Sequence, residues 1–212
     1  MKKLAFILLS LFVSISLFFS CTKINNIEIN TIGTYPTPLI KPLPLRVSVY
    51  YGNDFGTFET TQTVKIPNTD LTFIDHVKMG KANTVLFDTI LPMVFEKVTH
   101  VRNLPKGPDN LKNVDLIIEP KVHSYSIPNP TADGVYIHIV YDINFYLPEG
   151  KQISFWRIEG TGHALPQIEL KTEVTAVTEL TQMAMREVAA NFMTDFCNQK
   201  EIIKLFYNQC KQ

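Results

Sequence analysis

Three histidines lie on three consecutive segments that read as strands, and their chemistry could be used together. They are His123, His138 and His163. Imidazole nitrogens bind zinc, and a carboxylate of Glu119 or Glu159 would complete a four-ligand site. Antiparallel neighbours bring side chains of one face close together. None of these residues follows the spacing of a zinc motif, however, so we expect polar residues on a wet sheet face and no metal.

The sequence shows no arrangement of a nucleophile with its base. The motif G-x-S-x-G is absent, and Ser124, Ser126 and Ser154 lie inside predicted strands. The stretch GTGHALP is followed by neither the lysine nor the helix start that a phosphate-binding loop requires. Scattered carboxylates do not define the spaced acid–base pair of a glycosidase. We therefore expect no catalytic residue, no cofactor and no enzyme activity.

Four aromatic residues flank a predicted hairpin turn, LPEGKQ, and form a candidate partner-binding surface. They are Phe145, Tyr146, Phe155 and Trp156. Aromatic side chains near a hairpin tip can anchor a partner protein, with Asp142, Asn144 and Arg157 as a polar rim. The alternative is that the aromatics pack under a helix or pair across strands. Strand alternation points part of the set outward.

The N-terminus has the pattern of a secretory signal. Two lysines precede residues 4–19, which are all apolar residues or serines. Ser20 and Cys21 follow this run directly. This run of 16 residues is shorter than the about 20 that a membrane-spanning helix needs. We expect residues 1–20 to be a cleaved signal peptide. The alternatives for this N-terminus are an incidental Cys21 with ordinary cleavage nearby, as in a secreted protein, and an uncleaved anchor.

The residues LFFSC resemble the lipobox of bacterial lipoproteins. In that family the cysteine, here Cys21, receives a lipid and becomes the N-terminus after cleavage. This sequence departs at Phe18, where the family prefers Leu, and at Phe19, where small or branched residues are usual. The resemblance implies stable membrane attachment through two or more acyl chains, such as palmitate. Position 22 is threonine. In enteric bacteria the absence of aspartate at this position favours export to the outer membrane, where the protein would face the periplasm.

The charge balance excludes a nucleic-acid partner. The chain has 20 basic and 20 acidic residues, and removing residues 1–20 takes away two lysines, leaving 18 against 20. This balance provides no basic surface for phosphates. It provides no polybasic patch for anionic lipid either, so membrane attachment depends on the lipid anchor.

Two further cysteines, Cys197 and Cys210, lie in a stretch that reads as helical. On one straight helix they would be about 20 Å apart, whereas a disulfide needs Cα atoms within about 7 Å. They can pair only if the chain folds back near Asn198, and otherwise they are separate packed thiols. The exported compartment permits the bond.

Prolines divide the rest of the chain. Residues 21–44 hold four of them, Pro36, Pro38, Pro42 and Pro44, and are predicted to form an extended tether or, alternatively, a proline-rich ligand. A single domain is expected over 45–212. Hydrophobic periodicity predicts its elements: strands over 45–51, 57–66 and 71–77, a helix over 83–99 kinked near Pro92, strands over 114–127, 135–147 and 153–164, and helices over 173–196 and within 200–210.

This order, β-β-β-α-β-β-β-α-α, predicts an α+β fold: an antiparallel sheet with two main helices packed on one face. The segment 135–147 alternates apolar and polar residues most regularly. Pro120 suggests an edge position or a bulge in its strand, and Gly160 and Gly162 suggest a bulge or a close backbone approach.

The stretches RVSVYY, LFDTILPMVFEKV and YIHIVYDINFYLPEGKQISFWRIEGTG resemble YajG-type envelope lipoproteins, and also the small α+β domains of lipoprotein cofactors of outer-membrane assembly and peptidoglycan synthesis. The likeness covers most of the domain through apolar spacing. It implies a non-catalytic accessory or scaffolding subunit of the cell envelope with an envelope protein as partner. The alternative is a periplasmic carrier of lipid or another apolar ligand, which would need an apolar pocket of about 300 Å³ or more between helix and sheet. A hydrolase would require a catalytic cluster to appear in the fold.

Overall fold

The computed structural model describes residues 21–29, 35–37, 41–105, 111, 113–165 and 173–211, which form two β-sheets and a set of helices. The strands are β1 (Cys21–Glu28), β2 (Leu43–Tyr50), β3 (Glu59–Lys65), β4 (Leu71–Lys78), β5 (Phe95–Val101), β6 (Leu116–Ser126), β7 (Val135–Tyr146) and β8 (Gln152–Ala164). The helices are α2 (Gly80–Val94), α3 (Glu173–Asp195), η1 (Phe196–Asn198), α4 (Lys200–Leu205) and α5 (Tyr207–Cys210). The predicted α+β class is confirmed.

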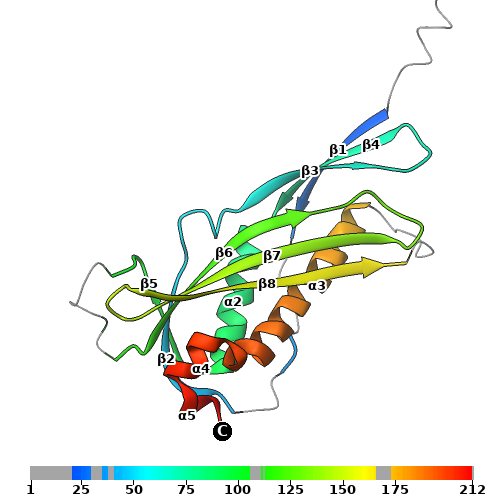
Figure 1. Cartoon of the computed structure of the whole chain (residues 1–212). Helices are drawn as coiled ribbons and strands as arrows, with labels where there is room; N and C mark the ends of the chain where they lie inside the picture. Colours follow the sequence, from blue (N-terminus) through cyan, green and yellow to red (C-terminus); the bar gives the residue numbers. More distant parts are fainter. Residues whose placement is uncertain are drawn as a thin grey trace, which may run out of the picture.

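The larger sheet has five strands in the order β5-β2-β6-β7-β8 (Figure 1). The last three form an antiparallel meander, but β2 runs parallel to both β5 and β6. The sheet is therefore mixed, and the prediction of a purely antiparallel sheet is wrong. The chain leaves β2 and returns as β5 only after passing through β3, β4 and α2. Such a long crossover with a helix is what parallel pairing requires.

The smaller sheet has three strands in the order β1-β4-β3 and extends from one end of the molecule (Figure 1). Strand β1 pairs in parallel with β4, from Cys21 opposite Leu71 to Glu28 opposite Lys78. Its presence differs from the expectation of an extended tether over residues 21–44, because the first eight residues of that segment are a paired strand. Ile27 in this strand is buried in the core, which explains the pairing.

Helix α2 ends earlier than predicted. The sequence predicts a bent helix up to residue 99, whereas the helix stops at Val94 and the chain continues as β5. Pro92 lies two residues before this end. Proline removes a helical hydrogen bond and clashes with the preceding turn, so the helix ends shortly after it instead of bending and continuing.

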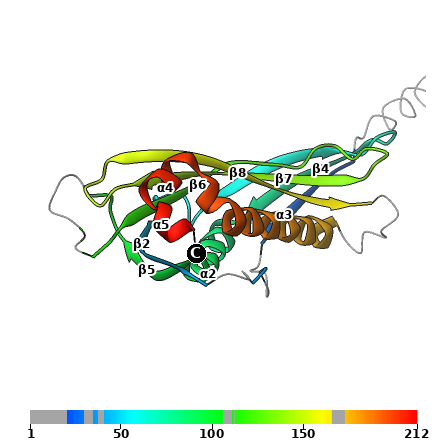
Figure 2. The same cartoon turned by 60° about the horizontal axis from the view of Figure 1, so that its bottom comes forward.

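Helices α2 and α3 cover one face of the five-stranded sheet, as predicted (Figure 2). The regular alternation of β7 is confirmed, because its inward residues are fully buried: Ile137, Ile139, Tyr141, Ile143 and Phe145. Helix α3 lies very close to β8. A side chain at Gly160 or Gly162 would collide with the backbone carbonyls of Ala184 or Leu180. The predicted close backbone approach is thus confirmed.

Pro120 lies on a part of β6 that has only one strand neighbour. The pairing of β6 with β2 covers only Leu116 to Ile118, and a register shift follows between Val122 and Ser124. The missing N–H of the proline therefore interrupts no bond to β2, in agreement with the predicted edge position or bulge.

The C-terminal segment folds back on the end of α3. Cys197 and Cys210 form a disulfide with their Cα atoms 5.4 Å apart. The reversal is made by η1 and the short helices α4 and α5, and Gln199 between them has an extended backbone. The bond ties the end of α5 to η1, which directly follows α3.

Candidate functional site

The aromatic residues predicted to form a partner surface divide between the core and the outside. Phe145 is fully buried, and Trp156 stacks on Phe192 of α3 at 5.6 Å between ring centroids. Phe145 therefore belongs to the core and cannot contact a partner, whereas Trp156 is half-buried and packs under α3, which is the alternative that the sequence left open. Phe155 remains 50% exposed, with the Arg157 guanidinium carbon 5.6 Å from its ring centroid. Tyr146 is half-buried.

The Tyr146 side chain is occupied by a buried carboxylate. Its hydroxyl donates to Oε2 of Glu119 at 2.7 Å, and Nδ2 of Asn144 donates to the same oxygen at 3.1 Å. Nζ of Lys121 lies 3.1 Å from it as well. Burial and then the bond to Glu119 raise the pKa of the Tyr146 phenol above its ordinary value. Tyr146 therefore stays a protonated donor that fixes a structural carboxylate.

Phe155 lies beside a charged cluster on the outer face of β6, β7 and β8. Nε of Arg157 donates to Oδ1 of Asp142 at 2.8 Å, and Nδ1 of His123 lies 3.0 Å from Oδ2 of Asp142. Burial alone would raise the pKa of the Asp142 carboxyl, but Arg157 and His123 outweigh it and hold that pKa below its usual value. The Asp142–Arg157–His123 cluster and Phe155 together present one aromatic ring and fixed charges on the sheet face that α2 and α3 leave uncovered.

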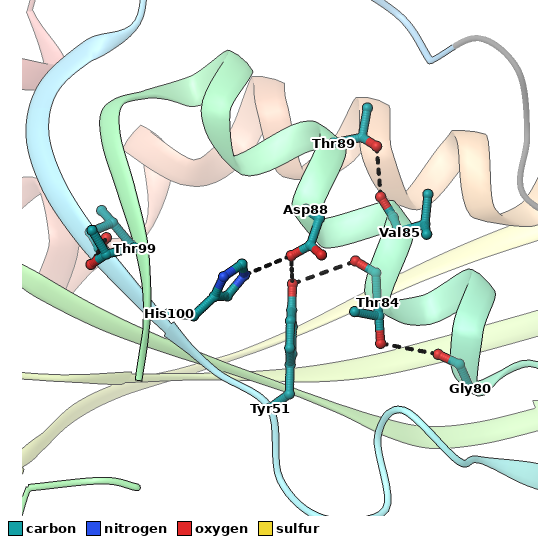
Figure 3. Close-up of polar contacts among 9 residues, drawn as sticks. Tyr51, Gly80, Thr84, Val85, Asp88, Thr89, Thr99 and His100 are labelled. Atoms are coloured by element: carbon teal, nitrogen blue, oxygen red, sulfur yellow. Dashed lines mark hydrogen bonds and ion pairs between the residues drawn. The ribbon is translucent and has the colours of Figure 1, made fainter. Parts of the chain in front are cut away.

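A second polar cluster joins α2 to the edge of the sheet (Figure 3). The Tyr51 hydroxyl donates to Oδ1 of Asp88 at 2.6 Å, and Nε2 of His100 lies 2.9 Å from the same oxygen. The Tyr51 ring stacks on Phe55 at 5.2 Å. Burial, followed by the contact with Asp88, raises the pKa of Tyr51 far above its ordinary value. The phenol cannot act as a base near neutral pH, so the cluster fastens α2, β2 and β5 together.

The histidines considered as zinc ligands have separate partners. His138 Nδ1 lies 3.2 Å from Oγ1 of Thr161, and His163 Nε2 lies 3.0 Å from the carbonyl oxygen of Asp133. The Tyr136 ring lies parallel to the rings of both His138 and His163, with centroids 6.2 Å and 4.4 Å away. Within the described part of the chain, no group of three or more His, Cys, Asp or Glu residues is placed to hold a metal ion.

An apolar pocket of about 170 Å³ lies where the two sheets meet the beginning of α3. Its lining includes Val64, Phe73, Val135 and Ala176, together with the buried Asp75. Oδ1 of Asp75 accepts a hydrogen bond from Nδ2 of Asn25 at 2.8 Å. Oδ2 accepts none from the residues that the structure describes. A carboxylate with one free oxygen in an apolar wall is costly.

A larger pocket of about 460 Å³ lies beside the disulfide. It is enclosed by the beginning of β2, the end of α2 and the end of α3, and its lining combines apolar and polar side chains: Lys41, Leu43, Val94, Met193, Thr194, Phe196, Cys197, Asn198 and Cys210. This volume falls within the range of small-molecule sites.

The predicted lipidation residue, Cys21, is the first residue of β1, and its backbone lies opposite Leu71. The predicted signal peptide, residues 1–20, lies outside the described residues. Among the helices that the structure describes, none combines the length and apolar character needed to cross a membrane.

Sequence reasoning missed two groups of contacts: Asn25 with Asp75, and Asp88 with both Tyr51 and His100. The members of each are 12 to 50 residues apart. No local spacing links them. The pairing of β1 with β4 joins Asn25 to Asp75, and the pairing of β2 with β5 together with the position of α2 joins Tyr51 and His100 to Asp88.

Comparison with known proteins shows a likeness of fold only in outline. No family model and no curated protein matches the chain. A solved Xanthomonas campestris protein described as DUF330 is similar at 8% identity and a TM-score of 0.46, with 82% of this chain and 92% of that chain covered. A minor lipoprotein from Acinetobacter baumannii is similar at 9% identity and a TM-score of 0.41, with 73% and 92% covered. A hypothetical protein from Chlamydia trachomatis is similar at 7% identity and a TM-score of 0.37, with 73% and 99% covered. Likeness at this level carries no functional assignment.

Proposed function

We propose that this chain is a lipid-anchored, non-catalytic accessory protein of the bacterial cell envelope that binds a partner protein. Cys21 would be its acylated N-terminus, on the outer membrane and facing the periplasm. The observation that carries the proposal is the N-terminal sequence, in which two lysines, an apolar run and Ser20 lead directly to Cys21.

The anchor is tested by intact-mass analysis of the protein purified from bacterial membranes. The expected mass is that of residues 21–212 plus acyl chains. Cys21→Ser should release the protein from the membrane fraction, because the acyl chains that would attach it are carried by the Cys21 sulfur. A protein that keeps residues 1–20, or begins elsewhere without acyl mass, would contradict the proposal.

The partner surface is best assigned to Phe155 and the Asp142–Arg157–His123 cluster beside it. Protein interfaces are enriched in aromatic residues, Phe among them, and in arginine, and their rims are polar. The helices cover the opposite face of the same sheet.

Crosslinking of the membrane-bound protein tests this surface. Phe155→Ala should remove the crosslinked partner, whereas Tyr207→Ala should retain it. Tyr207 is a well-matched control because it is an aromatic residue outside the sheet, on helix α5, with 49% exposure, against 50% for Phe155. Loss of the partner in both variants, or in neither, would refute the assigned surface.

The pocket beside the disulfide, with its mixed apolar and polar lining, favours a second candidate function, the carriage of a lipid. The pocket between helix and sheets is smaller than the about 300 Å³ expected of a ligand site, but the pocket beside the disulfide is larger. A fluorescent fatty acid should bind the carrier, and Met193→Trp should fill this pocket and abolish the signal. Ala176→Trp, in the smaller pocket, is the control.

A further inference from the structure

We propose that the end of the molecule carrying Cys21 rests in the headgroup layer of the bilayer, with the turn between β3 and β4 lying at the depth of the lipid headgroups. The inference rests on the proposed lipidation of Cys21 and adds an orientation and a membrane-contacting surface to it. The surface consists of the β3–β4 turn, residues 66–71, with Ile24 and the neighbouring ends of β8 and α3.

No spacer separates the anchor from the folded chain. Cys21 is already paired with Leu71 in the smaller sheet. Neighbouring strands are about 4.8 Å apart, so acyl chains on Cys21 hold Leu71 close to the membrane. The proline-rich segment expected to act as a spacer comes after β1, so it cannot lift the sheet away from the anchor.

The β3–β4 turn is long enough to extend from the anchor into the headgroup layer. Residues 67–70 lie beyond the pair formed by Cys21 and Leu71, and the turn is closed by a bond from the Ile66 N–H to the Leu71 carbonyl. Two residues of extended chain span about 7 Å. The headgroup layer on each side of the hydrocarbon core is about 5–7 Å thick. A turn next to the anchor therefore lies at the depth of the headgroups.

The end of the molecule that carries Cys21 exposes several apolar side chains. Ile24 is 62% exposed, and Leu71 is 41% exposed. Leu165, which follows β8, is 61% exposed, and Val174 in the first turn of α3 is also exposed. The lining of the 170 Å³ pocket shows that β4 and the first turn of α3 lie side by side, and both views place them at the same end (Figure 1, Figure 2).

Exposed apolar side chains at one end suit a membrane interface, where their burial is favourable. Charge contributes little, because the exposed Lys23, Lys65 and Asp70 beside the anchor leave a balance of only one positive charge. The contact therefore depends on apolar residues and on the anchor beside them.

Spin labelling of the lipidated protein tests the orientation. One label is placed by Pro67→Cys at the exposed turn, and the control label by Glu149→Cys in the exposed β7–β8 turn. With Cys21 acylated and Cys197 bonded to Cys210, the introduced cysteine is the only free thiol. The protein is reconstituted into vesicles of phosphatidylethanolamine and phosphatidylglycerol. Collisions with oxygen, which concentrates in lipid, are compared with collisions with a water-soluble nickel complex.

The label at position 67 should show a several-fold higher ratio of oxygen to nickel collisions than the label at position 149. Equal ratios at the two positions on vesicles, with the acyl mass present, would overturn the orientation while leaving the lipid anchor intact. Absence of acyl mass would overturn both. Hydrogen exchange of the unsubstituted protein gives a second measurement: the amides of residues 67–70 should exchange more slowly on vesicles than in the Cys21→Ser protein, and equal rates would also refute the contact.

Discussion

The two sheets differ in how many polar contacts a buried carboxylate receives. In the five-stranded sheet, Glu119 receives bonds from Tyr146 and Asn144 and lies beside Lys121. In the three-stranded sheet, the equally buried Asp75 receives one bond, from Asn25, and lines an apolar pocket. A satisfied polar network stabilises its surroundings, whereas a half-satisfied one is a weak point. We therefore expect the larger sheet with its helices to be the rigid part, and the smaller sheet to have the lower local stability.

The largest expected effect comes from the core of the rigid part. Phe192 is fully buried and touches the rings of Phe87, Phe95, Trp156 and Phe196. Phe192→Ala should lower the free energy of unfolding by about 3–5 kcal/mol in urea titrations. Phe73 is half-buried and lines the pocket beside the smaller sheet. Phe73→Ala should lower the free energy of unfolding by less than half as much. Equal losses would erase the proposed difference between the sheets.

The disulfide should give the next largest effect, again in the rigid part. The cysteines are 13 residues apart in sequence, and closing a loop of this size contributes about 3 kcal/mol. The double variant Cys197→Ala with Cys210→Ala should unfold at correspondingly lower urea concentration. Amide exchange in β1 and β4 should change no more than the global stability does. A selective loss of protection in β1 would show that the two ends are coupled.

Removing one amide donor from each carboxylate compares the sheets directly. Asn25→Ala leaves buried Asp75 without its hydrogen bond, which should cost about 1–3 kcal/mol. Asn144→Ala leaves Glu119 with Tyr146 and Lys121, so its cost should be about 1 kcal/mol or less. Urea unfolding gives both values, and exchange in β1 should rise only for Asn25→Ala. A larger loss for Asn144→Ala would reverse the interpretation.

The smallest effect is a pH dependence on the exposed face of the larger sheet. The folded-state pKa of Asp142 lies below its ordinary value, so its ionised form favours folding. This contribution is fully present above the ordinary carboxyl pKa of about 3.9 and is lost as the pH falls through the lowered folded value. Asp142→Asn should therefore flatten the stability profile only below about pH 4–5. A change near neutral pH would contradict this assignment.

Much of the fold follows from local pattern. The alternation in β7, the two main helices and the close approach at Gly160 and Gly162 are all readable in the sequence, because periodicity reports which face is buried. The partner surface was predictable only in part. Alternation placed Phe145 inward, but the position of α3 over Trp156 could not be read from β8 alone.

The sequence by itself determined the helical and strand periodicities, the α+β class and the lipobox-like approach to Cys21. The tertiary structure alone decided that β1 is a strand in place of a tether, that β2 lies parallel between β5 and β6, and that Asn25 meets Asp75. The physical reason is that burial within an element depends on neighbours a few residues away. A strand's partner and direction depend on contacts tens of residues distant, which no local spacing records.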